Sequence, residues 1–179
     1  MKKLFVLLLS VIVLPLASSA QSLPKTVQDV RKMYADAHQA IADMDLEEHM
    51  LCRMVSTSQC NMPAVGIRKE TITTYFNNAD RDEDWYPIFR PFFITRKFNA
   101  SVRQFYEEYL FDMKSGRLVF AFLQGDSYEH ETKDETRYYF GEDGLISENI
   151  KGDRIAEADA VVRYAESLRA ASVALMAEH

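Results

Sequence analysis

The sequence predicts an α+β fold: an N-terminal helix, an antiparallel meander of five or six strands forming a curved sheet, and a long C-terminal helix packed on it. Two observations predict the helices and the sheet. Apolar residues recur at steps of three and four near both ends of the chain, as on one side of a helix. Between them, residues 67–151 are rich in β-forming residues and are divided by Gly-containing turns.

The first twenty residues have the three parts of a secretory signal peptide. Two lysines precede an apolar run, Leu4–Leu16, and small residues follow up to Ala20. The run is short for a membrane span, although an uncleaved anchor is the alternative. We therefore expect residues 1–20 to be a signal peptide and residues 21–179 to form a single α+β domain. The protein would be periplasmic or secreted from a bacterium, with no membrane span after cleavage.

The composition excludes two broad classes of function. The chain has 179 residues with 27 acidic and 21 basic side chains, a net charge of −6. That sign repels phosphate backbones, and no stripe of Lys and Arg offsets it, so nucleic acid is not an expected partner. With 11 Phe and 9 Tyr against 6 Gly and 5 Pro, the chain is not a disordered one.

The first predicted helix runs from about Leu23 to Asp45, with Ser22 as a cap and Pro24 in its first turn. The segment 46–66 is expected to be a connector with one further helical turn.

Cys52 and Cys60 are the only cysteines. In an exported chain thiols are usually oxidised, so we expect a disulfide between them. An alternative uses the segment 49–62, which also holds His49, Met50, Met54 and Met62, as soft ligands in a copper-handling protein.

Six stretches after Gly66 read as consecutive antiparallel strands joined by short turns. Pro87 and Pro91 cannot donate to a ladder, which places the early part of the second stretch at an edge or bulge. The stretches are IRKETITTYF, YPIFRPFFITRKF, SVRQFYEEYLFDM, GRLVFAFLQG, DETRYYFG and LISENIKG.

The strand 118–123 is apolar at every position, so we expect it to be covered on both faces. Alternation would place Leu118, Phe120 and Phe122 on one face and the residues between them on the other. One face needs a helix, and the C-terminal helix beginning at Asp153 is long enough to cross the whole sheet.

No catalytic constellation is visible, and we expect no catalytic residue, metal or cofactor. His38 falls on the polar side of the first helix, and the chain has no Gly-x-Ser-x-Gly. The Glu129–Glu135 cluster, which contains His130, would serve a small periplasmic metal-dependent hydrolase. A solvated hairpin loop is the interpretation that we prefer for it.

A binding surface is better supported than a reaction site. If Tyr109 and Phe111 point into the core, then Tyr106 and Glu108 point the other way; by the same parity Arg137 and Tyr139 point outward. Arg96 or Arg103 would lie nearby. Tyrosine and arginine are enriched where partners dock, although Glu108 and Arg137 would form only a cross-strand charge pair if their strands were neighbours.

Trp85 is the second candidate for binding, because it lies between an acidic stretch and the aromatic YPIF. Burial of Trp85 under the end of the sheet is the competing interpretation. Together these features predict an exported, non-enzymatic binding module for a peptide, glycan or protein partner.

Overall fold

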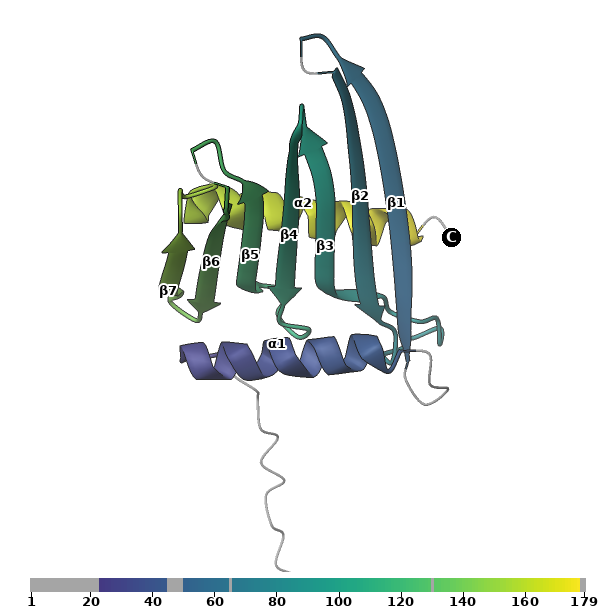
Figure 1. Ribbon diagram of the computed structural model, residues 1–179. Coiled ribbons are helices and arrows are strands. Elements are labelled where there is room, and N and C mark those ends of the chain that lie inside the picture. Colours follow the sequence, from purple (N-terminus) through teal and green to yellow (C-terminus); the bar gives the residue numbers. More distant parts are fainter. Residues whose placement is uncertain (1–22, 45–49, 65, 130, 178–179) are drawn as a thin grey trace, which may run out of the picture.

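A computed structural model describes residues 23–44, 50–64, 66–129 and 131–177. It has two helices and a seven-stranded antiparallel sheet in which each strand pairs with its neighbours in sequence, β1 to β7 (Figure 1). The elements are α1 (Val27–Ala42), β1 (Leu51–Met62), β2 (Gly66–Asn77), β3 (Arg90–Ala100), β4 (Arg103–Phe111), β5 (Leu118–Asp126), β6 (Lys133–Gly141), β7 (Gly144–Lys151) and α2 (Ala158–Ala177). The predicted α+β meander with a closing helix is confirmed, but the strand count is seven rather than five or six.

The additional strand is β1, in the segment that was expected to be a connector. All twelve of its residues pair with β2, from Leu51 opposite Asn77 to Met62 opposite Gly66. Most of β1 is exposed, so its sequence lacks the apolar alternation that marks a half-buried strand. The β1–β2 hairpin projects beyond the rest of the sheet (Figure 1).

The first helix is shorter than expected because a capping box sets its start. Thr26 accepts a hydrogen bond from the Asp29 amide, and the Asp29 carboxylate accepts one from the Thr26 amide. The helix ends at Ala42, three residues before the predicted end. Ser22, the expected cap, lies outside the described residues, as does the predicted signal peptide.

Helix α2 crosses one face of the sheet (Figure 1) and buries most of the predicted apolar stripe. Val161, Ala165 and Leu168 pack on a core from β3 to β6, while Leu175, at the C-terminal end of the stripe, is exposed. The strand members of this core are Ile94, Tyr109, Phe111, Leu118, Ala121, Leu123, Tyr138 and Phe140.

Helix α1 packs on the opposite face at one end of the strands (Figure 1). Its buried residues Val30 and Ala37 share a second core with strand residues Phe92, Phe93, Leu110, Val119, Phe120 and Tyr139. The strand β5 is therefore covered on both faces, as predicted. Strict alternation fails at its start: Leu110 pairs with Phe120 and Phe111 with Leu118, so Val119 is the extra residue of a bulge that turns Leu118 toward α2.

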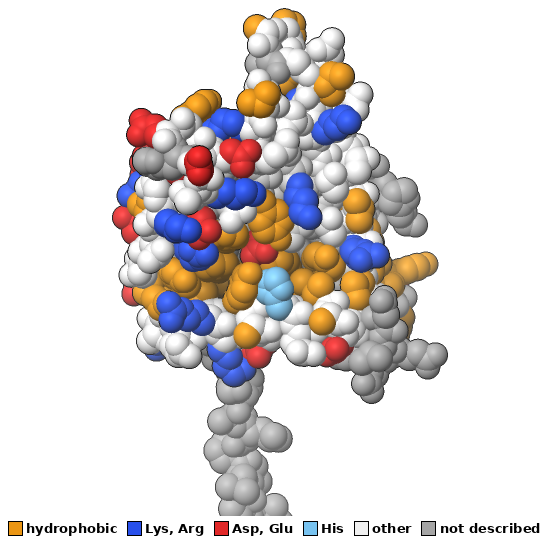
Figure 2. Space-filling model, viewed as in Figure 1, with side chains coloured by type: hydrophobic (Ala, Val, Ile, Leu, Met, Phe, Trp, Pro, Cys, Tyr) orange, Lys and Arg blue, Asp and Glu red, His pale blue; other side chains and the backbone are white. Residues whose placement is uncertain are grey.

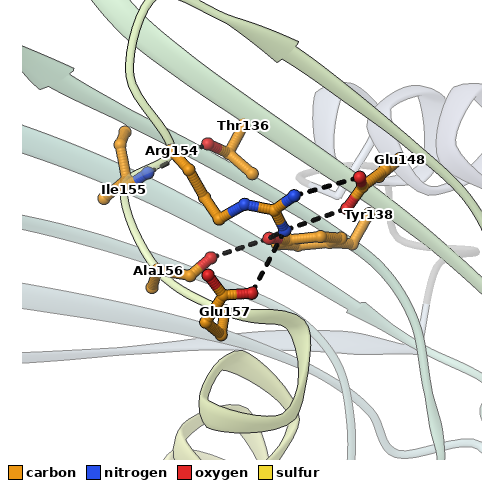
Figure 3. A network of polar contacts seen from close by, with 7 residues as sticks. All are labelled: Thr136, Tyr138, Glu148, Arg154, Ile155, Ala156 and Glu157. Carbon is orange, nitrogen blue, oxygen red and sulfur yellow. Dashed lines mark hydrogen bonds and ion pairs between the residues drawn. The ribbon is translucent and has the colours of Figure 1, made fainter.

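The linker between β7 and α2 is fastened to β6 by side chains that point toward α2. Thr136 accepts a hydrogen bond from the Ile155 amide, and the Tyr138 hydroxyl donates to the Ala156 carbonyl. Arg154 bridges Tyr138, Glu148 and Glu157 (Figure 3).

The Asp134 carboxylate accepts a hydrogen bond from the Asp153 amide. Helix α2 therefore does not begin at Asp153, as the sequence predicts, but five residues later at Ala158.

A buried ion pair sits on the α2 face of the sheet. Arg96 Nη1 lies 3.0 Å from Glu107 Oε2, and the hydroxyl of Tyr109 donates to the same oxygen at 2.7 Å. Arg96 also pairs with Glu70, and its guanidinium lies 4.7 Å from the ring centre of Tyr164 on α2. Arg96 is therefore on the face opposite Tyr106 and Glu108, which corrects its expected place beside them.

Candidate functional site

A cleft of about 410 Å³ lies on the α1 face, between α1 and strands β4 to β6. The space-filling view shows a hydrophobic hollow on this face with Lys and Arg side chains around it (Figure 2). The cleft is lined by Val30, Arg31 and Tyr34 from α1 and by Glu108, Phe120, Phe122, Arg137 and Tyr139 from the sheet. Three of the five predicted site residues, Glu108, Arg137 and Tyr139, are thus brought together.

Two tyrosines hold the carboxylate of Glu108. The hydroxyl of Tyr34 donates to Glu108 Oε2 at 2.6 Å, and that of Tyr106 donates to Oε1 at 2.5 Å. Glu108 is only 5% exposed, so its carboxylate has lost most of its hydrating water. The two tyrosine hydroxyls supply hydrogen bonds in place of that water. Tyr106 therefore belongs to the site as well, behind Glu108 rather than at its rim.

The same contacts raise the pKa of both tyrosines. Burial is the largest cause for Tyr34 and for Tyr106, followed by the hydrogen bond and the charge of Glu108, each of which disfavours a phenolate. Both hydroxyls therefore keep their protons over the physiological range. They act as fixed hydrogen-bond donors rather than as acid–base groups.

Arg137 is the charged group on the opposite side of the hollow. Its guanidinium lies 4.6 Å from the ring centre of Phe122, and its Nη2 lies 2.9 Å from Glu135 Oε2. The charge pair between Arg137 and Glu108, expected only if their strands were neighbours, is not formed: β5 separates β4 from β6 and places Phe122 opposite both residues. The aromatic ring thus lies between the acidic and the basic group.

Tyr106, Glu108, Arg137 and Tyr139 do share the face opposite Tyr109 and Tyr138, as strand alternation predicts. The expectation that they are exposed to solvent is wrong for two of them. Tyr139 and Glu108 are buried, because α1 packs over the end of this face. Arg137 and Tyr106 are half-buried. Arg103 is not beside them. It points to the face of the sheet opposite Tyr106, because an odd number of positions separates the two on β4. Its guanidinium lies over the rings of Phe105 and Tyr128.

A second hollow of about 320 Å³ continues the cleft toward β7. It shares Arg31, Arg137 and Tyr139 with the first and adds residues of β7, among them Ser147 and Asn149. Because Arg31 and Arg137 line both hollows, the two hollows form one elongated groove along α1, and these two residues lie where the hollows meet.

The strand residues that point to this face carry an excess of positive charge, although the whole chain is acidic. Only three of them are acidic, namely Glu108, Asp126 and Glu135. The basic ones include Arg53, Lys69, Lys97, Lys133, Arg137 and Lys151. The face is therefore suited to a negatively charged partner.

Trp85 lies apart from the groove, in the loop between β2 and β3. It is 82% exposed and has a positive φ of 65°, so its predicted burial alternative is wrong. The Asp82 carboxylate accepts hydrogen bonds from the amides of Asp84 and Tyr86, which fixes the loop around the tryptophan. The indole is therefore held in the open by a strained, hydrogen-bonded loop, away from the groove.

The acidic loop at Glu129–Glu135 does not converge on one point among the described residues. Glu129 and Glu131 are exposed, Asp134 is buried against the linker to α2, and Glu135 lies on the other face with Arg137. His130 lies outside the described residues. In the part of the chain that the structure describes, no three His, Cys, Asp or Glu side chains are grouped to hold a metal ion.

The predicted disulfide between Cys52 and Cys60 is not formed, and both cysteines are free. The two lie on the same extended strand, β1, eight residues apart. At roughly 3.3 Å per residue they are separated by about 26 Å, whereas the Cα atoms of a disulfide lie within about 7 Å. The same extension spreads Met54 and Met62 apart, so a copper site within this strand is not supported.

Sequence reasoning missed the residues that α1 contributes. In the helical pattern of the sequence, Tyr34 falls on the apolar side and Arg31 on the polar side, and neither position links them to Glu108. No signal in the chain says which face of the sheet α1 covers. Phe120 and Phe122 were expected to be covered, as was the other face of their strand, but not to form the floor of a groove.

No family model, no curated protein and no solved structure matches this chain. Across the described residues, no helix has the length and apolar character needed to cross a membrane.

Proposed function

We propose that this protein is an exported, non-enzymatic binding module that holds an elongated, negatively charged ligand in the groove along α1. The observation that carries the proposal is the placement of Arg31 and Arg137 together above an aromatic floor. Guanidinium groups bind carboxylates through paired hydrogen bonds, and aromatic walls take up apolar groups.

The ligand chemistry follows from the arrangement of charge. Glu108 lies in the floor with both oxygens engaged by tyrosine hydroxyls, so an anionic group would avoid it and bind at the arginines. Phe120 and Phe122 offer an apolar surface next to that position. A ligand with a carboxylate beside an aromatic or aliphatic group fits both, as in an acidic peptide segment.

A role as a scaffold for binding agrees with the chemistry of the groove. Burial and the neighbouring Glu108 raise the pKa of Tyr34 and of Tyr106, so neither hydroxyl is poised to transfer a proton. Export is supported by the first twenty residues of the sequence, which have the charge, length and small residues of a signal peptide.

The test compares three blocked tetrapeptides that differ only in charge: acetyl-Phe-Glu-Phe-Glu-amide and the versions with Gln or Lys in place of Glu. We expect calorimetric titration to rank the acidic peptide first and the basic peptide last. The Arg137→Gln variant should weaken binding of the acidic peptide roughly tenfold, as for loss of a charged hydrogen-bonding partner.

Arg163→Gln is the matched control, because it removes the same charge from an exposed position on α2. It should leave binding unchanged. Equal affinity for all three peptides, or equal loss in the two variants, would show that the groove does not select an anionic ligand.

A further inference from the structure

The outer edge of β1 is an unprotected strand edge. In the described part of the chain, β1 pairs only with β2, and its other side is free over twelve residues. Natural proteins usually protect such an edge with lysines, prolines, bulges or a short strand. β1 has none of these, and Arg53 is its only charged residue. The opposite edge strand, β7, has eight residues and carries Glu148 and Lys151.

The side chains of β1 favour pairing with another strand. The four residues Val55–Ser58 are all β-branched or small, and Val55 is an exposed apolar residue. The two free cysteines differ by an even number of positions, so both point to the same face of the sheet, the α2 face. Cys60 is exposed and Cys52 is half-buried.

We propose that β1 pairs antiparallel with β1 of a second copy of this chain, with Ser56 opposite Ser56 of the partner subunit. Cys52 then forms a disulfide with Cys60 of the partner subunit, and Cys60 forms one with Cys52 of the partner subunit. Along β1, the backbone N–H and C=O groups of alternate residues point away from β2 and are free to bond a new strand. In antiparallel pairing, such a residue must lie opposite another of the same kind, so two opposed residues are both even-numbered or both odd-numbered.

Two of the registers with matched parity pair eleven of the twelve residues of β1, and no other such register pairs as many. One of these two sets Cys52 of each chain opposite Cys60 of the other. Opposed Cα atoms in an antiparallel ladder lie about 4.5–5.5 Å apart, which is within the range of a disulfide. The register with the greatest overlap is therefore also one that allows two symmetric bridges.

Helix α2 does not obstruct this arrangement. Ser172 of α2 hydrogen-bonds to Thr74, and Thr74 pairs with Met54 of β1, so α2 crosses the edge near Met54. In the proposed register Met54 faces Ser58 of the partner subunit. The two copies of α2 are thus displaced by four residues, about 13 Å, which exceeds the 10–12 Å diameter of a helix.

Each bridge forms by thiol–disulfide exchange with an oxidant that carries a disulfide, such as oxidised glutathione. The Cys60 thiolate attacks the oxidant and releases one thiol, and Cys52 of the partner subunit then displaces the second. Two cysteine thiols lose two protons and two electrons, and the oxidant is reduced to two thiols. Cys60 reacts first because it is exposed, whereas burial raises the pKa of Cys52.

The test oxidises the purified chain with oxidised glutathione and separates the products without reductant. We expect a covalent dimer that dithiothreitol reverses. Cys52→Ser and Cys60→Ser should each yield at least roughly tenfold less dimer alone, because serine cannot form the bridge. An equimolar mixture of the two variants should restore a covalent dimer, since it retains one matched pair of cysteines.

Strand pairing is tested without thiol chemistry by the Ser56→Lys variant, which sets two ammonium groups directly opposite each other. We expect the dimer, measured by sedimentation of the reduced protein, to be weakened by roughly fivefold. Asn149→Lys on the β7 edge is the matched control and should have no effect.

Three outcomes would overturn the proposal. They are a chain that remains a monomer under oxidant, a bridge within one chain, and dimers from either single variant at the wild-type yield.

Discussion

The hydroxyl of Tyr34 donates a 2.6 Å hydrogen bond to the carboxylate of Glu108, across 74 residues of sequence. This bond joins α1 to the middle of the sheet and closes the inner side of the groove. Since Tyr106 takes the other oxygen of Glu108, one buried carboxylate organises donors from two elements. The stability and the pH response of the protein should therefore both report on this cluster.

Removing one donor should destabilise the fold. We expect Tyr34→Phe to lower the free energy of unfolding by about 1–2 kcal/mol, because it leaves an oxygen of a buried carboxylate without its partner. Urea denaturation measures the change. Tyr86→Phe, which removes an exposed hydroxyl, should change it by less than about 0.5 kcal/mol. Equal effects in the two variants would mean that the Tyr34–Glu108 bond contributes nothing to stability.

The cluster should make the protein sensitive to alkali. The pKa values of Tyr34 and Tyr106 are raised in the folded protein above the ordinary 10.0, first by burial. As pH rises through 10, the unfolded chain loses these protons while the folded chain keeps them, so the free energy of unfolding falls. Below that pH the contribution is fully present. Urea midpoints from about pH 8 to 11 should fall less steeply in the Tyr34→Phe/Tyr106→Phe double variant.

Removing only one partner of the buried Arg96–Glu107 ion pair should strongly destabilise the fold. We expect Arg96→Met to lower the free energy of unfolding by about 3–5 kcal/mol, because Glu107 is left buried without its counter-charge. Adding Glu107→Gln should recover part of that loss in a double-mutant cycle. No recovery in the double variant would show that Arg96 acts through packing on Phe98 and Tyr164 instead.

The linker before α2 depends on a buried hydroxyl. Thr136→Val keeps the shape of the side chain but leaves the Ile155 amide without its acceptor, at an expected cost of about 1–2 kcal/mol. Hydrogen exchange at the Ile155 amide should accelerate in the variant. Thr132→Val, in the exposed loop before β6, is the matched control, and comparable exchange at Ile155 in both variants would contradict the role of Thr136.

Trp85 should be unnecessary for folding. Its side chain is exposed and its backbone has a positive φ, which a glycine adopts without strain. We expect Trp85→Gly to leave the free energy of unfolding unchanged or to raise it by up to about 1 kcal/mol. A loss of more than that in thermal or urea denaturation would mean that the indole supports the fold and is not available to a partner.

Much of the fold was accessible from local pattern. The apolar stripe of α2, the turns before Gly116 and Gly144, and the unbroken apolar run in β5 each predict their element, because helical and strand periodicities are local properties. β1 escaped this reasoning because an edge strand that is exposed on both faces carries no alternation. The bulge at Val119 depends on how β4 and β5 pair. The start of α2 at Ala158 depends on hydrogen bonds from β6 to the preceding linker, so neither feature could be predicted from local pattern.

The sequence by itself determined which side chains share a face: Tyr106 with Glu108, and Arg137 with Tyr139, follow from the two-residue period of a strand. Only the tertiary structure decided that α1 covers that face, that β5 stands between Glu108 and Arg137, and that Tyr34 completes the cluster. The physical reason is the distance along the chain over which each feature is decided. Side-chain parity is set within a few bonds, whereas the choice of face for a helix depends on the apolar area that all strands together leave to be buried.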